Sequence, residues 1–177
     1  MPGSSTTIQH LALRQDDPCG DSSPASLLFP YSGSPTADAA LDVAAGWAHA
    51  LFADIWVLYV RPWDTCRGGH YFVETRHEAR SVAQTAVRRL RGRGVPASGV
   101  LRDASRERVA RAILAEADAV DARLIVLGTG SRGVVGRALL GSTSAAVARR
   151  TARPLILVEA RSKIGAATPS GWLRPHL

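Results

Sequence analysis

The chain of 177 residues contains only two cysteines, Cys19 and Cys66, and a single lysine, Lys163. Two isolated cysteines give neither a disulfide framework nor the ligand clusters with which proteins hold a metal. No apolar run approaches the roughly 20 residues that cross a bilayer, and the first residues lack the basic and apolar regions of a secretory signal peptide. We therefore expect a cytoplasmic protein with no metal site and no membrane association.

The net charge of +7 comes almost entirely from arginine. A basic protein is suited to nucleic acid or to other anionic partners. The densest cluster is Arg88, Arg89, Arg91 and Arg93, at the predicted end of a helix, where cations complement the helix dipole. No aromatic side chains alternate with these arginines, as they do on many surfaces that bind single strands. We therefore expect no nucleic-acid partner.

Hydrophobic periodicity begins at Ala25 and ends near Ala160. Residues 1–24 and 161–177 are rich in Ser, Gly, Pro and charged residues and have no sustained period, so we interpret them as a mobile leader and a mobile tail. Residues 25–160 suffice for one domain with a complete core.

Short apolar runs alternate with helical periodicity throughout this domain. This order predicts an α/β fold, a single open parallel five-stranded sheet with helices on both faces. The predicted strands are residues 25–31, 55–60, 96–101, 124–127 and 154–158.

The first predicted helix has a clear start. Ser34 followed by Pro35 is typical of an N-cap and a first helical position. Val43, Trp47 and Leu51 recur every four residues. With the flanking alanines they predict one narrow apolar face that packs on the sheet; these alanines are Ala40, Ala44 and Ala48.

Three further local signals fix element boundaries. Arg61 and Pro62 are expected to stop the second strand, with a loop over residues 63–69. Because it is short and contains proline and glycine, the strand at 96–101 is expected near a sheet edge. Ser105 is predicted to cap the third helix.

The stretch from Leu124 to Ala160 carries the clearest chemical pattern. An apolar strand leads into a glycine-rich loop, a helix beginning near Ser142 and another apolar strand. Glycines let the backbone approach an anion, and the free amides of a helix N-terminus bind it. Ligands of parallel sheets bind where the strand order reverses, so we expect the loop after the first strand to meet this one. The pattern predicts a phosphate-binding crevice.

The same loop allows a second interpretation. Gly128, Gly130 and Gly133 have the spacing of a dinucleotide-binding fingerprint for NAD or FAD. That fingerprint is expected on the first strand of its fold, and the 17 residues after Ala160 are too few for a second nucleotide-binding half. The dinucleotide interpretation is therefore less favoured.

Two segments, LLFPYSGSPTADAALDVAAGWAHALFADIWVLYV and LIVLGTGSRGVVGRALLGSTSAAVARRTARPLILV, resemble the universal stress protein domain, and the resemblance covers residues 25–160. It implies a parallel sheet of strand order 3-2-1-4-5 and a homodimer, which we expect to form through the last strand at 154–158. It also implies a role in the stress response.

The ATP-binding branch of that family implies a site for ATP or a related adenine nucleotide, with Mg²⁺ only as a counter-ion of bound ATP. The chain departs from the branch's pattern at Ser131, where the motif has glycine, and at Ser32, where the family has aspartate. Pro30, Ser32 and Val60 are expected around the base and ribose. The residues expected at the phosphates are Gly128, Thr129, Gly130, Ser131, Arg132, Gly141, Ser142 and Thr143.

No nucleophile and base stand together in the sequence, because Ser34 and Ser142 are accounted for as helix caps and no histidine is near either. We therefore expect no catalytic residues and no efficient enzyme activity. The alternative to nucleotide binding is a dimeric regulatory or interaction module of the same fold with no nucleotide bound.

Overall fold

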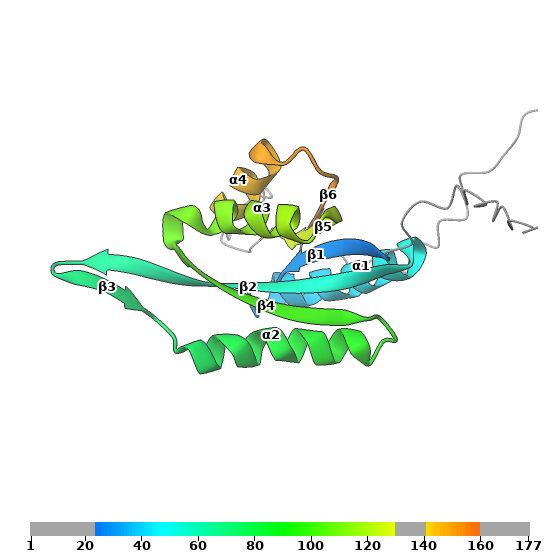
Figure 1. Cartoon of the computed structure of the whole chain (residues 1–177), viewed down its shortest axis with the longest axis horizontal. Coiled ribbons are helices and arrows are strands. Elements are labelled where there is room, and N and C mark those ends of the chain that lie inside the picture. The colour runs from blue at the N-terminus through cyan, green and yellow to red at the C-terminus, as the bar shows by residue number, and fades with distance from the viewer. Residues whose placement is uncertain (1–23, 130–140, 160–177) are drawn as a thin grey trace, which may run out of the picture.

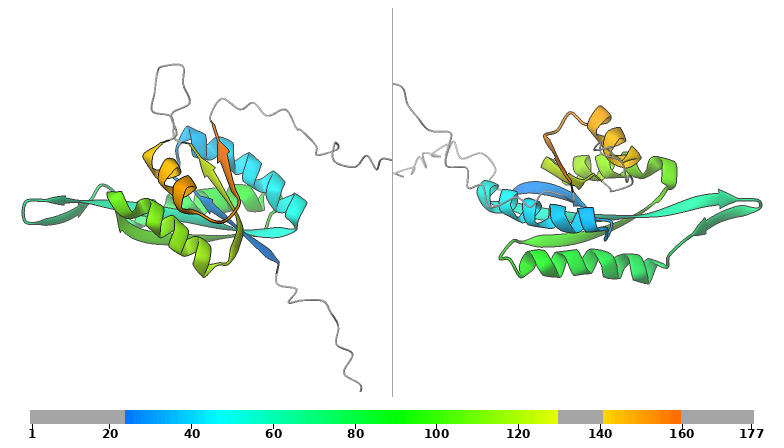
Figure 2. Two further views of the ribbon diagram at one scale, coloured as in Figure 1. Left: turned by 90° about the horizontal axis from the view of Figure 1, so that it is seen from above. Right: turned by 180° about the vertical axis from the view of Figure 1, so that it is seen from behind.

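The computed structural model describes residues 24–129 and 141–159. They form one mostly parallel sheet with helices on both faces (Figures 1 and 2). In chain order the elements are Ala25–Pro30 (β1), Pro35–Leu51 (α1), Ala53–Cys66 (β2), Gly69–Phe72 (β3), Arg76–Arg91 (α2), Ala97–Ser105 (β4), Arg106–Arg108 (η1, a 3-10 turn), Val109–Ala119 (α3), Ala122–Gly128 (β5), Ser142–Arg150 (α4) and Leu155–Val158 (β6).

The five parallel strands lie in the order β4-β2-β1-β5-β6. Counted along the chain, this is the order 3-2-1-4-5 that the resemblance implied. The predicted count of five strands is wrong by one, because β3 adds to the sheet as an antiparallel partner of β2.

The hydrophobic core has one layer on each face of the sheet. Alternate strand residues point to opposite faces, so Leu27 and Phe29 pack under α1 and α2, while Leu28 packs under α3 and α4. Both faces are covered, which is why the strands appear in the sequence as continuous apolar runs.

The buried face of α1 consists mostly of alanine. The prediction is confirmed for Ala40, Ala44 and Ala48 and is wrong for the larger side chains. Trp47 and Leu51 are 44% and 42% exposed, and Val43 is only partly buried. Small side chains bring the helix axis closer to the sheet than tryptophan would allow, since a packed interior leaves no room for the larger ring. The residues of α1 that are buried are Thr36, Ala37, Ala40, Leu41, Ala44, Ala45 and Ala48.

Strand β2 continues beyond Arg61 and Pro62, contrary to prediction. Within the parallel ladder the amide of Ile55 donates to the carbonyl of Pro96. The backbone N–H and C=O groups of odd-numbered β2 residues therefore point to β4, and those of even-numbered residues point to the opposite side. The last residue of β1 pairs with Leu58. The missing N–H of Pro62 therefore points to a side where β1 has already ended, and the proline is tolerated.

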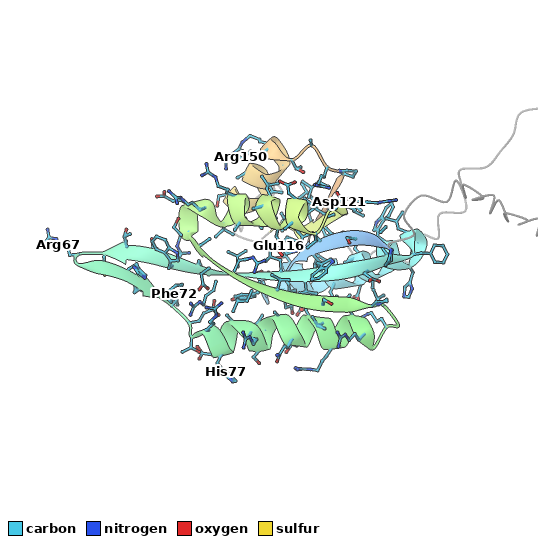
Figure 3. All side chains as sticks on the ribbon, viewed as in Figure 1. Arg67, Phe72, His77, Glu116, Asp121 and Arg150 are labelled. Atoms are coloured by element: carbon cyan, nitrogen blue, oxygen red, sulfur yellow. The ribbon has the colours of Figure 1, made fainter. Side chains whose placement is uncertain are left out.

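The predicted loop at 63–69 is instead part of a hairpin. Residues Trp63–Cys66 pair antiparallel with β3, and the turn uses Gly68 at φ +99°. The hairpin projects beyond the body of the domain, with Arg67 at its tip (Figures 1 and 3). We call the paired residues 63–72 the arm.

Arg61 holds the base of the arm. Its guanidinium lies 3.6 Å from the centre of the Phe72 ring and makes two hydrogen bonds, of 2.9 and 3.0 Å, to the carboxylate of Asp103 on β4. Nearby, the hydroxyl of buried Tyr59 donates to Glu74, and burial is the main cause that raises the pKa of this tyrosine. The buried arginine thus links three strands.

Acid should weaken this clamp. The hydrogen bonds and charge of Arg61 hold the pKa of the Asp103 carboxyl below its ordinary value of 3.8. A carboxylate with a lowered folded-state pKa stabilises the fold above its unfolded-state pKa, and this contribution disappears as the pH falls through the folded-state value. Asp103→Asn should lower the free energy of unfolding at pH 7 and flatten its fall below about pH 4. Urea unfolding at pH 7 and across the acid range measures both; equal pH slopes for the variant and the parent would contradict the assignment.

Two predicted boundaries around β4 are wrong. The strand extends to Ser105, nine residues in all, because it follows the long β2 residue by residue up to Trp63. Its position at the sheet edge was predicted correctly. Ser105 precedes the η1 turn and makes no side-chain cap, so α3 begins only at Val109.

The arginines at the end of α2 bind to neighbouring elements and do not simply face solvent. Arg89 pairs with Asp38 and Arg93 with Asp42, which joins α2 to α1. Arg91 donates to the carbonyl of Ala97 at 2.9 Å. None of the helices in the described residues is long and apolar enough to cross a membrane.

Candidate functional site

The strand order reverses at the carboxyl end of β1. From β1 the chain goes to β2 on one side, whereas β5 lies on the other side, with Leu28 opposite Ile125. The connections to α1 and α2 therefore diverge from those to α3 and α4. Open parallel sheets bind ligands beyond the strand ends at such a switch point, so we expect a crevice here.

A chain of hydroxyl groups lies at the start of α1, on one wall of this crevice. Ser34 is the N-cap, and its Oγ accepts a hydrogen bond of 3.2 Å from the amide of Ala37. The hydroxyl of Ser32 donates to Ser34 at 3.0 Å, and Ser34 contacts the buried Thr36 hydroxyl at 2.9 Å. The predicted cap at Ser34 with Pro35 in the first turn is confirmed.

Gly128, the last residue of β5, touches the same helix start. A Cβ at this position would lie 2.9 Å from the carbonyl carbon and oxygen of Thr36, closer than side chains approach backbone. The glycine is therefore required for the first turn of α1 to sit on the end of β5. This packing role is distinct from the phosphate contact that the sequence predicted.

The start of α4 is fastened to the same strand end. The amide of Gly141, the N-cap, donates to the carbonyl of Thr129 at 3.1 Å. The hydroxyl of buried Ser144 donates to the carbonyl of Gly128 at 3.1 Å. Two helix N-termini, those of α1 and α4, thus converge on Gly128 and Thr129.

The amides at this point divide into used and available donors. The amides of Gly141 and Thr129 donate to the carbonyls of Thr129 and Val158, respectively. The amides of Ser142–Ser144 have no carbonyl one turn earlier within the helix. They have no partner among residues 24–129 and 141–159, and Gly141 has no side chain to cap them. With exposed Ser142 and half-buried Thr143, this first turn of α4 is the part suited to an anion.

One charged group at the same helix start, Asp38, is already neutralised. Asp38, in the first turn of α1, accepts from the Tyr31 hydroxyl at 2.6 Å and pairs with Arg89. The hydrogen bond from Tyr31 is the main cause that holds the pKa of Asp38 below its ordinary value, while burial raises the pKa of Tyr31. The pairing limits repulsion between this carboxylate and an anion at the crevice.

The model of the Universal stress protein family matches residues 25–159. The chain belongs to this family. A search of curated proteins finds no match.

Solved structures of other universal stress proteins have the same fold. The protein from Burkholderia pseudomallei is 26% identical, with a TM-score of 0.58 over 75% of this chain and 94% of that one. The protein from Archaeoglobus fulgidus in complex with dAMP is 24% identical, with a TM-score of 0.58 over 76% and 96%. A universal stress protein in complex with cAMP is 22% identical, with a TM-score of 0.59 over 78% and 99%.

Most of the predicted site residues lie around the switch point of this universal stress protein. Pro30 is buried at the end of β1 and pairs with Leu58, and Val60 lies two residues further along β2. Ser32 is exposed and joins the hydroxyl chain. The remaining described members are Gly128, Thr129, Gly141, Ser142 and Thr143 at β5 and α4. Gly130, Ser131 and Arg132 lie outside the described residues.

Sequence reasoning missed three groups at this crevice. Thr36 and Ser144 are buried hydroxyls that connect each helix start to its surroundings. Their signal was weak: each is a serine or threonine within the first turn of a predicted helix. The Tyr31–Asp38 pair spans seven residues, and Arg89 is 51 residues from Asp38, so no local pattern marks this cluster.

Proposed function

We propose that this universal stress protein is a stress-response module that binds ATP or a related adenine nucleotide at the crevice between α1 and α4. The observation that carries the proposal is the convergence of two helix N-termini on Gly128 and Thr129 at the strand-order switch. Solved relatives in complex with dAMP and cAMP support the adenine nucleotide as ligand class. They do not distinguish ATP from a monophosphate.

The phosphates are assigned to the first turn of α4. Ser142 and Thr143 supply hydroxyls and amides there, and the helix dipole favours negative charge. Gly141 acts by position: its hydrogen bond to Thr129 sets where the turn begins. Pro30, at the end of β1, and Val60, two residues beyond Leu58 on β2, are assigned to the base.

The hydroxyl chain is assigned to the ribose. Ser32 stands where the family has aspartate, and a serine hydroxyl both donates and accepts, whereas a carboxylate only accepts. Ser32 is oriented by Ser34, which in turn contacts Thr36. A sugar hydroxyl would thus meet a neutral partner of fixed orientation and form a weaker hydrogen bond than with aspartate.

Gly141→Val should lower the affinity for AMP and ATP by at least about tenfold. The first atom of the new side chain would lie 3.2 Å from the Thr129 carbonyl oxygen, so the start of α4 has to shift. Isothermal titration calorimetry with AMP, ATP and NAD measures the effect. Gly46→Val is the matched control, because Gly46 is exposed on α1 with nothing near its Cβ position.

The same titration separates the alternatives. Binding of AMP or ATP that is lost in Gly141→Val and kept in Gly46→Val supports the proposal. Binding of NAD in preference to both would favour the dinucleotide interpretation. No binding of any of the three would contradict the proposal and favour an interaction module without nucleotide.

We also propose a homodimer through β6. Within the described residues this strand pairs only with β5, and Leu157 on it is 36% exposed. An edge with so few charges is open to a second copy. Leu157→Lys should shift the protein toward monomer in sedimentation velocity; an unchanged mass would contradict the assignment.

A further inference from the structure

The opposite edge of the sheet is longer and more open. Strand β4 pairs with β2 over nine residues, and no other strand of the described chain pairs with it. Sheet edges are usually protected by a short edge strand, by charged side chains, by proline or by a covering loop. Here Ser98 and Gly99 are exposed near its start, and Arg102 and Asp103 near its end.

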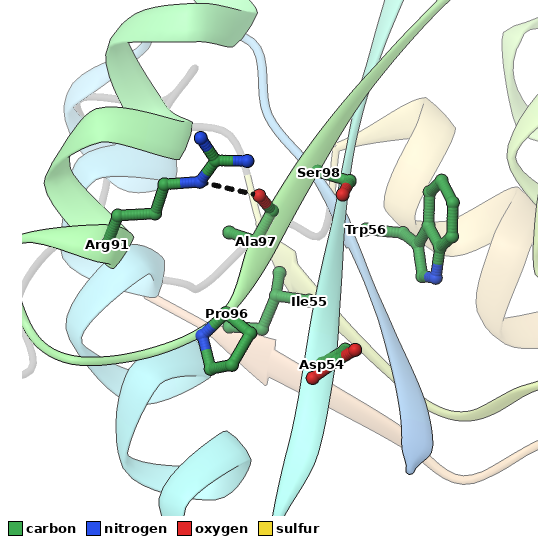
Figure 4. Close-up of a pocket in the computed structure, with 7 residues that line it drawn as sticks. All are labelled: Asp54, Ile55, Trp56, Arg91, Pro96, Ala97 and Ser98. Atoms are coloured by element: carbon green, nitrogen blue, oxygen red, sulfur yellow. Dashed lines mark hydrogen bonds between the residues drawn. The ribbon is translucent and has the colours of Figure 1, made fainter. Parts of the chain in front are cut away.

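The hydrogen-bonding groups on the outer side of β4 can be identified. The amide of Ile55 donates to the carbonyl of Pro96. In this parallel ladder the backbone N–H and C=O groups of even-numbered β4 residues therefore point to β2, and those of odd-numbered residues point outward. Two side-chain contacts agree: Arg91 donates to the carbonyl of Ala97, and Arg102 reaches that of Leu101 at 3.5 Å. Figure 4 shows Arg91 over Ala97 at the start of the strand. The outward amides available to a new strand are those of Gly99, Leu101 and Asp103.

A groove of about 950 Å³ runs along this edge between α2 and α3. The α2 wall contributes Ala83 and Val87, and the α3 wall contributes Ala119 and Val120. The floor is the outer edge of β4 from Gly99 to Arg102. A second, smaller hollow of about 220 Å³ lies beside the start of β4, where Arg91 and Pro96 line it (Figure 4). Together they leave a path along the strand edge.

The charges around this groove are strongly unequal. Its lining contains the arginines Arg76, Arg80, Arg88, Arg91 and Arg102 and a single carboxylate, Glu116. Glu116 of α3 is buried on the side of the helix that faces the sheet (Figure 3) and is neutralised by Arg102 of β4 at 2.7 Å. Asp103 at the far end pairs with Arg61 and lies 3.8 Å from Arg76. The α2 wall therefore carries uncompensated positive charge.

We infer that the outer edge of β4 is a docking site for an extended acidic segment of a partner protein, which adds to the sheet as a further strand. Main-chain hydrogen bonds to the odd-numbered residues supply affinity, and alternate side chains supply specificity. Side chains of an added strand point alternately to the two walls. Acidic residues would face the arginines of α2, and small apolar residues would face Ala119 and Val120 of α3. This inference does not depend on nucleotide binding.

The test uses the full chain and a labelled seven-residue peptide in which glutamate alternates with valine. Fluorescence anisotropy should show binding that weakens as the salt concentration rises. A control peptide of the same length, in which lysine replaces each glutamate, should not bind. Gly99→Pro should weaken binding at least about tenfold, because it removes an outward amide. Proline is tolerated where an edge-strand N–H faces away from the sheet, and the Cβ position of Gly99 is 3.4 Å from a Val87 methyl, the near limit of ordinary van der Waals contact.

A charge variant makes the test independent of Gly99. Arg80→Glu combined with Arg88→Glu should abolish binding of the glutamate peptide. The control, Arg149→Glu combined with Arg150→Glu, changes the net charge by the same amount on α4, which does not line the groove. It should weaken binding much less. Equal binding of both peptides, or tighter binding of a single-stranded oligonucleotide, would overturn the inference. So would a dimer that dissociates in Gly99→Pro, since the edge would then belong to a second copy.

Discussion

Replacing Gly128 by alanine is expected to lower the free energy of unfolding by about 2 kcal/mol and to abolish adenine-nucleotide binding. The added carbon would lie 2.9 Å from both carbon and oxygen of the Thr36 carbonyl and 3.1 Å from the Ala37 amide nitrogen. All three are backbone atoms, so relief requires α1 to move away from β5. The hydroxyl chain at the start of α1 would move with the helix.

Gly46→Ala provides the matched control for this experiment. Gly46 lies in the exposed middle of α1 with open space at its Cβ position, and alanine should raise stability by about 0.5–1 kcal/mol through helix propensity. Urea unfolding gives the stability of both variants, and calorimetry gives their nucleotide affinity. A Gly128→Ala protein as stable as the parent would show that this glycine is not needed for the contact between α1 and β5.

Leu58→Ala should cost more stability, about 3 kcal/mol, and leave nucleotide affinity nearly unchanged. The Leu58 side chain is fully buried in the core layer under α3 and α4. Several neighbours in that layer, such as Ala110 and Ala117, are alanines, which have no side-chain rotamers with which to fill a cavity. The main-chain carbonyl of Leu58 still accepts from Tyr31 in the variant, so the end of β1 keeps its position.

Leu51→Ala is the same chemical change at a side chain that is 42% exposed, and it should cost less than about 1 kcal/mol. Chemical unfolding measures both variants, and binding is compared well below their melting temperatures. Loss of affinity in Leu58→Ala equal to that in Gly128→Ala would contradict the separation between core packing and the site.

The sheet and its order could be predicted because local signals and topology agree. Runs such as residues 25–30 are apolar on both faces only in a parallel sheet covered by helices, and Ser34 with Pro35 is an unambiguous helix start. The arm could not be predicted. Whether the proline at 62 ends a strand depends on where the neighbouring β1 ends, and the clamp joins Arg61 to Asp103 across 42 residues.

The sequence could not show which glycines and amides of the candidate site are free to meet a ligand, for a related reason. The glycine pattern has the same appearance whether a glycine accommodates a phosphate or another helix, and only the position of Thr36 shows that Gly128 does the latter. Likewise, whether an amide is available depends on carbonyls distant in sequence: Thr129 donates to Val158, which no local motif indicates. Setting those donors aside leaves the first turn of α4 as the place where we propose that an anion binds.

The measurement that tests the nucleotide site most directly is an NMR titration of the full chain with AMP, followed amide by amide. The largest chemical-shift changes should occur at Ser142–Ser144, with smaller ones at Ser32 and Ser34. They should saturate at one nucleotide per chain. Changes centred on the β4 edge, or no saturable changes at all, would contradict the assignment of the crevice between α1 and α4 as an adenine-nucleotide site.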